Sequence, residues 1–285
     1  MSKIRLRTLL VLVVGLIAAV GIAACGDDDS STSGDTTATD AGSADLGLTK
    51  DGTLTAGSDI PFPPFEQGDP PDYEGFDIDL INDVAGRLGL ETEIRDVPFF
   101  AITSGGGQGF DLGIAATTIT PERERKVDFS DPYFNAEQSM LVAAGGDIKS
   151  IDDVTSDTIV GAQDGTTGET YASENTDADV RPFEQIDDAY GALERGQVDA
   201  VFNDLPSTQS VADDSGGALE VAQTFDTREE YGIVFRQEEA TQALLEAVNG
   251  ALQEIKDDGT LDELYQKWFQ TDAPKSLLTA THEAT

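Results

Sequence analysis

An arginine near the start of an expected helix is the residue of this chain best suited to hold an anion. In TTITPERERKVDFSDPYF (117–134), Thr120 is a favourable N-cap and Pro121 a favourable first helical residue. Arg123 then falls in the first turn, beside free backbone N–H groups and the positive end of the helix dipole, where a cation is mildly unfavourable. A guanidinium in that place suits a carboxylate or phosphate held by two hydrogen bonds. The alternative is a short surface helix in which Arg123 pairs with an adjacent glutamate.

Two further polar segments follow in the second half of the chain. In GTTGE (165–169), Thr166 and Glu169 fit a capping box, which marks a helix start. Asp204 ends the strand-like run VDAVFN and fits the N-cap of the helix that follows it. Each segment alone is explained as an ordinary helix start, so a role in ligand binding needs support from the rest of the chain.

Catalytic and metal-binding patterns are nearly absent from this sequence. The one histidine, His282, lies in a polar C-terminal tail (272–285), where we expect it to be solvated and without function. The one cysteine is Cys25, and the sequence contains no Ser/His/Asp arrangement and no cluster of metal ligands. Acid–base chemistry would therefore fall to Asp59 or Asp204. We expect no cofactor and no metal.

The first 25 residues predict export and lipid attachment. A basic start precedes an uncharged apolar run, Thr8–Ala24, which ends in small residues directly before Cys25. This pattern is typical of a bacterial lipoprotein signal (1–24), after which the cysteine becomes the lipidated first residue. The alternative is an uncleaved membrane helix, because the run is near the lower length limit for spanning. We expect an extracytoplasmic protein that lipid anchors to the bacterial cell membrane.

The chain is strongly acidic. It carries 55 acidic and 17 basic side chains, for a formal charge of −38. Loss of the signal removes further basic residues and makes the mature chain more negative. This charge excludes nucleic acid as a partner. We interpret it as a solvated acidic coat.

The pattern of apolar residues predicts an α/β fold behind a flexible acidic tether (25–51). From residue 52 strand-like and helix-like segments alternate, which indicates largely parallel sheets covered by helices. Trp268 and Phe269 are expected to anchor the core. The expected strands are 53–58, 91–97, 110–116, 158–163, 198–203 and 231–236, and the expected helices are 76–88, 167–174, 186–195, 206–212, 244–255 and 261–269.

With these segments in order, the chain resembles the periplasmic solute-binding proteins of ABC importers, in the family that binds polar amino acids (family 3). The resemblance rests on seven strings in family order: LTAGSDIPFPPFE, YEGFDIDLINDVAGRLG, FDLGIAATTITPERERKVDFSDPYF, VGAQDGTTGETY, QVDAVFNDLPS, YGIVF and DGTLDELYQKWF. It implies a two-lobed, type II periplasmic-binding-protein fold with a ligand cleft between the lobes. The implied bounds are 52–132 plus 231–271 for lobe 1, 133–230 for lobe 2, hinges near 133–138 and 226–231, and a polar tail at 272–285.

The resemblance also implies how the carboxylate of an amino acid would be held. Arg123 matches the carboxylate clamp of the family, supported by the hydroxyl and backbone of Thr118. The backbone N–H groups of Thr167 and Gly168, at the start of the helix in lobe 2, would face the same carboxylate.

The ligand ammonium and the pocket wall follow from the same resemblance. Asp204 matches the residue that pairs with the ammonium, and the Ala116 carbonyl and Thr118 are further acceptors. Phe62 and Phe99 match aromatic residues that line the side-chain pocket, although each alone would be interpreted as a core residue.

The far end of the ligand would be contacted by Asp59 and Gln163. Asp59 has no lysine or arginine beside it in sequence, which favours neutral, glutamine-like or cationic ligands over acidic ones. The chain departs from the family at TSGGGQG (103–109), where four glycines predict a loop or frayed turn in place of a helix.

The resemblance thus implies a monomeric, lipid-anchored receptor that captures a polar amino acid and presents it to an ABC permease. Two alternatives stay open at this point. One is a dehydratase-like enzyme on the same fold, and the other is a ligand-sensing module for a signalling partner.

Overall fold

The computed structural model describes residues 46–105 and 109–282. The expected signal 1–24, the lipidation residue Cys25 and nearly all of the tether lie outside the described residues. Within the described ranges, no helix is both long enough and apolar enough to cross a membrane.

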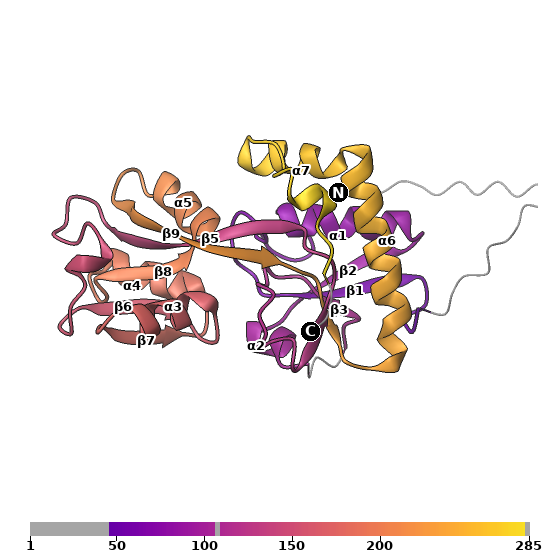
Figure 1. Ribbon diagram of the computed structural model, residues 1–285, viewed down its shortest axis with the longest axis horizontal. Helices are drawn as coiled ribbons and strands as arrows, with labels where there is room; N and C mark the ends of the chain where they lie inside the picture. The colour runs from indigo at the N-terminus through magenta and orange to yellow at the C-terminus, as the bar shows by residue number, and fades with distance from the viewer. Residues whose placement is uncertain (1–45, 106–108, 283–285) are drawn as a thin grey trace, which may run out of the picture. The chain divides into compact units, whose positions relative to one another are not determined.

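The first lobe is built on a five-stranded mixed sheet in the order β2-β1-β3-β10-β4 (Figure 1). Strand β1 is buried along its whole length and pairs in parallel with its two neighbours, β2 and β3, whereas β10 is antiparallel to both β3 and β4. The expectation of largely parallel sheets is therefore only partly correct. The bounds are β1 Thr53–Ser58, β2 Glu91–Asp96, β3 Leu112–Gly113, β4 Val127–Phe129 and β10 Val234–Arg236.

Helices α1, α6 and α7 pack together in the first lobe. Helix α1, predicted at 76–88, buries Phe76, Leu80 and Val84, which recur every four residues. Its N-cap, Gly75, has φ 140°, and a Cβ at that position would lie 1.9 Å from the Phe65 carbonyl oxygen, so only glycine fits. The helix bounds are α1 Phe76–Arg87, α2 Phe99–Thr103, α6 Gln242–Asp258 and α7 Thr260–Phe269, with short 3₁₀ turns at Glu239–Thr241 and Leu277–Thr279.

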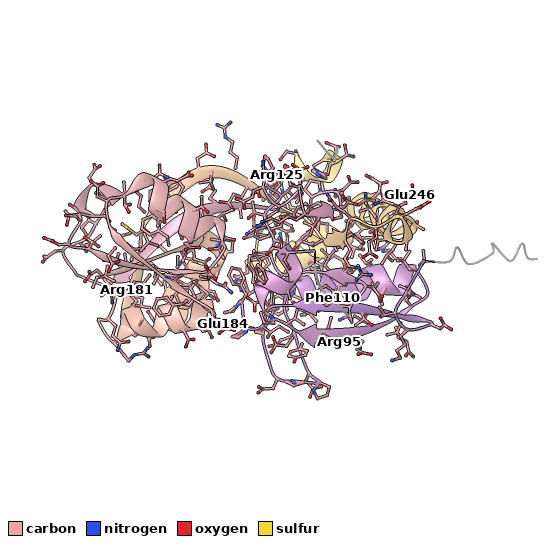
Figure 2. All side chains as sticks on the ribbon, turned by 90° about the horizontal axis from the view of Figure 1, so that it is seen from below. Arg95, Phe110, Arg125, Arg181, Glu184 and Glu246 are labelled. Carbon is pink, nitrogen blue, oxygen red and sulfur yellow. The ribbon has the colours of Figure 1, made fainter. Side chains whose placement is uncertain are left out.

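The second lobe contains the sheet β7-β6-β8-β5-β9. Strand β6 is parallel to β7 and β8, whereas β5 is antiparallel to β8 and β9. Exposed charged side chains project from both lobes, among them Arg181, Glu184 and Glu246 (Figure 2). The bounds are β5 Phe134–Ala143, β6 Ile159–Gln163, β7 Asp179–Phe183, β8 Ala200–Asp204, β9 Leu219–Tyr231, α3 Thr167–Asn175, α4 Ile186–Glu194 and α5 Leu205–Asp214, with a 3₁₀ turn at Ile151–Asp153.

Two long antiparallel strands, β5 and β9, connect the second sheet to the first lobe (Figure 1). Where they enter the first lobe, Phe134 and Tyr231 stack on each other with ring centroids 5.4 Å apart. The Phe65 ring centroid lies 4.9 Å from that of Phe134 and 5.4 Å from that of Tyr231, and the Phe269 centroid lies 5.0 Å from that of Phe134. Phe269 thus belongs to the core, as predicted, and Trp268 is partly buried with its indole N–H donating to Asp79. The aromatic cluster fixes one end of each connecting strand.

The predicted helix after Thr120 is wrong, because residues 121–126 form a single turn. The Thr120 carbonyl accepts from the Glu124 N–H at 2.9 Å, and the Thr120 hydroxyl accepts from the Arg123 N–H at 3.2 Å, which is the expected cap. Strand β4 begins directly afterwards at Val127, so the chain has no room for a second turn. The strand predicted at 110–116 likewise shrinks to β3.

The polar C-terminal tail is also predicted wrongly, because its described part packs on the first lobe. Leu277 is fully buried, and the Ala280 carbonyl accepts from Lys256 Nζ at 2.9 Å. The His282 side chain is 14% exposed, with Nε2 3.2 Å from Glu124 Oε1, and its backbone N–H donates to Asp131 at 2.7 Å. His282 is therefore held in place and is not freely solvated.

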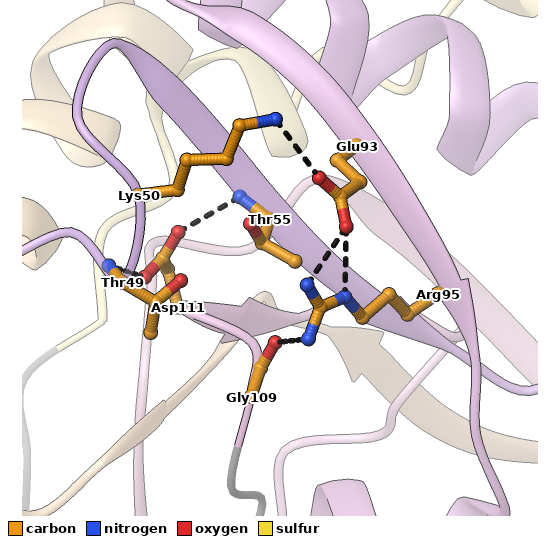
Figure 3. Close-up of polar contacts among 7 residues, drawn as sticks. All are labelled: Thr49, Lys50, Thr55, Glu93, Arg95, Gly109 and Asp111. Atoms are coloured by element: carbon orange, nitrogen blue, oxygen red, sulfur yellow. Dashed lines mark hydrogen bonds and ion pairs between the residues drawn. The ribbon is translucent and has the colours of Figure 1, made fainter.

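The loop predicted at 103–109 is only partly correct, because Thr103 ends helix α2, which the sequence did not predict; Ser104 and Gly105 are not helical, and residues 106–108 lie outside the described residues. Its far end is tied to β2, because Arg95 donates to the Gly109 carbonyl and pairs with Glu93 (Figure 3). The Asp111 carboxylate accepts from the Thr49 and Thr55 backbone N–H groups at 2.6 and 2.8 Å. These contacts fasten the start of the described chain to the first sheet.

Candidate ligand-binding site

A narrow cavity lies between the two lobes. Nine of the ten residues selected from the sequence line it, and Gly168 is the exception. Four further residues line the cavity and were not predicted as ligand contacts: Glu66, Ala115, Thr166 and Asn203.

Arg123 is buried in the cavity wall and not on the surface. It is 8% exposed, and its guanidinium lies 5.0 Å from the centre of the Phe99 ring. It donates to the Thr118 carbonyl at 2.8 Å and, across the lobes, to the Gly165 carbonyl at 3.1 Å. Burial lowers the pKa of Arg123, against the effect of nearby carboxylates. Both hydrogen-bond partners are neutral, so the charge of this guanidinium lacks a directly bonded carboxylate among the described residues.

The alternative for Arg123, a surface pair with an adjacent glutamate, is not what the structure contains. Glu122 instead pairs with Lys126 at 3.4 Å, and Glu124 lies beside His282. The arginine that does lie on the surface of this turn is Arg125, which is exposed (Figure 2).

Asp204 faces Arg123 from the second lobe. It is the N-cap residue of α5, but its side chain makes no capping hydrogen bond. Its two carboxylate oxygens accept instead from Gln138 Nε2 on β5 and from the Tyr231 hydroxyl on β9. Burial, with the nearby Glu229 carboxylate, raises the pKa of Asp204 to about 7. A cation next to this carboxyl would favour its ionised form.

The GTTGE segment starts helix α3 as predicted, with one difference in its cap. The Thr166 hydroxyl accepts from the Glu169 N–H at 3.2 Å, but the Glu169 carboxylate accepts from the Gly165 N–H at 2.7 Å. Gly168 lies against β8, where a Cβ would come within 2.8 Å of the Phe202 carbonyl oxygen. Its missing side chain brings α3 close to β8, and any donation from its N–H to a ligand stays a prediction.

The far end of the cavity is acidic. Asp59 accepts from Gln163 Nε2 at 2.6 Å and from Gln185 Nε2 at 2.9 Å, and burial raises its pKa. Glu66 is fully buried, and no N–H group or alcohol of the described residues donates to either of its carboxylate oxygens. Burial and the adjacent Asp77 raise the pKa of Glu66 well above its usual range.

Glu66 was missed although it stands in the quoted string PFPPFE. A charged residue that follows two phenylalanines and three prolines is an unusual choice for a surface loop, and this was the available signal. Gln138, Glu229 and Tyr231 gave no such signal, because their partners in the site are 27 or more residues away in sequence.

The cavity between the two lobes thus contains one buried arginine and several buried carboxyls, and known proteins share this chain's sequence pattern. A family model for bacterial extracellular solute-binding proteins, family 3, matches residues 54–271. The chain belongs to this family. The described segment that packs on the first lobe after residue 271 lies beyond the match.

Relatives of this solute-binding protein are named for the amino acids they bind. The ABC transporter glutamine-binding protein GlnH of Bacillus subtilis is 35% identical over 174 residues, which is 58% of this chain and 62% of GlnH. The matched region thus spans less than two thirds of that relative.

Solved structures agree with the fold. An ancestral arginine-binding protein bound to arginine has a TM-score of 0.69 and 38% identity, covering 76% of this chain and 98% of that one, and it was also solved bound to glutamine. The ancestral amino acid-binding protein AncCDT-1, a precursor of cyclohexadienyl dehydratase, has a TM-score of 0.68 and 38% identity, covering 76% of this chain and 95% of that one.

Proposed function

We propose that this chain is the extracytoplasmic receptor of an ABC importer and that it binds a polar amino acid in the cavity between its lobes. The observation that carries the proposal is the pair formed by Arg123 and Asp204. A buried guanidinium without a directly bonded carboxylate faces a buried carboxyl from the other lobe, which suits a zwitterion.

In the proposed pose, Arg123 takes the ligand carboxylate, helped by the N–H groups of Thr167 and Gly168 at the start of α3. Asp204 takes the ammonium, with the Ala116 carbonyl and the Thr118 hydroxyl as further acceptors. Two aromatic rings, Phe62 and Phe99, would then wall the ligand side chain, which points toward Asp59 and Gln163.

The acidic far end favours a cationic side chain over a neutral one. Asp59 and Glu66 line the cavity there and are buried, Asp77 is buried beside Glu66, and none of the three is in an ion pair with a described lysine or arginine. Burial of carboxylates without a countercharge is costly, and a guanidinium or ammonium from the ligand would offset that cost. A guanidinium can also bind carboxylates through two parallel hydrogen bonds. We therefore place L-arginine ahead of L-glutamine as the ligand.

The lobe bounds and anchoring are part of the same proposal. Lobe 1 comprises 52–132 plus 231–271 and lobe 2 comprises 133–230, with hinges in the connecting strands near 133–138 and 226–231. Hinge closure traps the ligand. The chain acts as a monomer on a tether (25–51) that Cys25 anchors to the membrane. Replacing Cys25 with Ala should move the protein from the membrane fraction to the soluble one, and persistence in the membrane would contradict lipid anchoring.

A thermal-shift screen of the twenty amino acids with ornithine, citrulline and cystine tests the ligand class. A ligand at 100 times its dissociation constant adds ~2.7 kcal/mol of stability, and we expect the cationic amino acids to give the largest shift. No shift with any compound would contradict the proposal. Turnover of prephenate or arogenate by the purified protein would instead support the dehydratase alternative.

A matched pair of variants in the same turn tests the site. Arg123→Met should weaken binding of the ligand found in the screen about 150- to 4,000-fold, about 3 to 5 kcal/mol, because it leaves the ligand carboxylate buried without a partner. Arg125→Met removes the same charge from the exposed face, so titration calorimetry should give a dissociation constant within about threefold of the parent. Equal losses of affinity in both variants would show that binding depends on the overall charge of the protein and not on Arg123 in particular.

A further inference from the structure

Glu229 is a buried carboxylate on the connecting strand β9, and it bonds to both lobes. It is 8% exposed. One of its oxygens, Oε2, accepts from the hydroxyl of Thr118 in the first lobe at 2.6 Å and from the hydroxyl of Thr167 in the second lobe at 2.8 Å. The other oxygen accepts from the Thr227 hydroxyl at 3.1 Å. A single carboxylate oxygen thus joins two residues that line the cavity.

These contacts fix the direction of the Thr118 hydroxyl. A threonine hydroxyl has one hydrogen to donate and two lone pairs that accept. The Thr118 hydrogen points to Glu229, because a carboxylate can only accept. Toward the cavity this hydroxyl therefore offers only lone pairs, which attract an ammonium and repel a carboxylate.

The same network reaches the residue that faces the ammonium. The Thr167 hydroxyl donates to Glu229 and accepts from Gln138 Nε2 at 3.1 Å, and Gln138 also donates to Asp204. Two acceptors for an ammonium, Asp204 and the Thr118 hydroxyl, are thus oriented by side chains of the connecting strands.

We propose that Glu229 is a positioning residue. It accepts the hydrogen of the Thr118 hydroxyl, so this hydroxyl can only accept from the ligand α-ammonium, and ligands without an α-ammonium bind more weakly. This inference rests on the proposed function. Because Thr118 and Thr167 belong to different lobes, the complete arrangement exists only when the lobes are as close as they are here.

The test compares each amino acid with its analogue lacking the α-amino group. L-Arginine is paired with 5-guanidinopentanoate, and L-glutamine with 4-carbamoylbutanoate. Calorimetry on the mature full-length chain gives the ratio of the two dissociation constants for whichever amino acid binds more tightly. Glu229→Leu and Glu229→Met, which differ in shape, both remove the acceptor, so the test survives if one of them fails to fold.

We expect the Glu229 variants to prefer the amino acid over its analogue less strongly than the parent protein does. Either Glu229 variant should reduce the ratio about tenfold or more, since a hydrogen bond to a charged group is lost, and Thr118→Val should do the same. The Glu229→Leu/Thr118→Val double variant should lose no more than either single variant, because both remove one interaction. Glu229→Gln keeps an oxygen acceptor and should stay within about threefold of the parent ratio.

Three results would overturn the inference. An unchanged ratio in Glu229→Leu and Glu229→Met would show that Thr118 does not depend on Glu229. Additive losses in the double variant would show two separate interactions, and loss in Glu229→Gln equal to that in Glu229→Leu would assign the effect to charge. If the parent protein binds no amino acid in the thermal-shift screen, the proposed function fails too, which distinguishes that failure from the others.

Discussion

The pKa of Asp204 predicts that ligand affinity falls steeply below neutral pH. Burial raises this pKa to about 7 in the ligand-free protein, although Gln138, Tyr231 and Arg123 act in the opposite direction. A ligand ammonium needs the ionised carboxylate, so a proton and the ligand compete for Asp204. The ligand keeps its own charges from pH 5 to 7, since α-carboxyl groups titrate below ~4 and α-amino groups above ~7.7.

The size of the effect follows from that pKa. With a pKa of about 7, half of the Asp204 carboxyls are ionised at pH 7 and about 1% at pH 5. The dissociation constant should therefore rise about 50-fold between these two values, which is about 2.3 kcal/mol at ~1.4 kcal/mol per tenfold. Calorimetry across this range measures it directly.

Asp204→Asn provides the control. It should bind weakly at every pH and should lose most of the pH dependence. A 50-fold change that survives in Asp204→Asn would refute the reasoning and would assign the titration to another group, such as Asp77, whose pKa burial also raises to about 7.

The stability of the ligand-free protein should change with pH in the opposite direction to its ligand affinity. Asp204 binds its proton more tightly in the folded state than in the unfolded chain, where its pKa is near 3.8. Between pH ~4 and ~7 the folded state therefore holds the extra proton, and the free energy of unfolding falls as pH rises through this window. The melting temperature of Asp204→Asn should fall less over the same range.

Two further substitutions test the acidic end of the cavity and the C-terminal segment. Glu66→Gln should weaken binding of a cationic amino acid roughly tenfold or more at pH 8. Glu246→Gln, on the exposed surface, should leave the affinity unchanged. If calorimetry gives equal affinities for the two variants, Glu66 does not contact the ligand. Leu277→Ala should lower the free energy of unfolding by about 2 to 5 kcal/mol, and Leu278→Ala, at a half-buried position, by less. A denaturant titration measures both, and no difference between them would mean that the segment does not stabilise the first lobe.

Elements with a clear apolar period were predictable from the sequence. The four-residue period of Phe76, Leu80 and Val84 predicted α1, and the unbroken small and apolar run Thr53–Ser58 predicted β1 with the bounds that the structure has. The long strand Leu219–Tyr231 was not found, because its sequence LEVAQTFDTREEY mixes charged and apolar residues without a regular period. Its regularity comes from pairing with β5, which no local pattern reveals.

The site residues divide in the same way. Arg123 was found because its position at a capped turn is locally unusual, although the helix expected around it is one turn long. Glu229 was not found, because its importance depends on Thr118, which precedes it by 111 residues. His282 was misread because its burial depends on the packing of nearby Leu277 and on an acceptor, Asp131, from a distant segment.

The place of β10 in the first sheet sets an order for folding. Val234 on β10 pairs with Gly113 on β3 and with Phe129 on β4, so β10 separates two strands that precede it by about a hundred residues. The sheet that ends beside the Arg123 turn therefore cannot be completed until Arg236 has been made. Contacts between distant segments form late, because the intervening chain must first be closed into a loop. A chain that emerges from its N-terminus would thus have an incomplete first sheet, and no finished wall behind Arg123, until Arg236 had emerged.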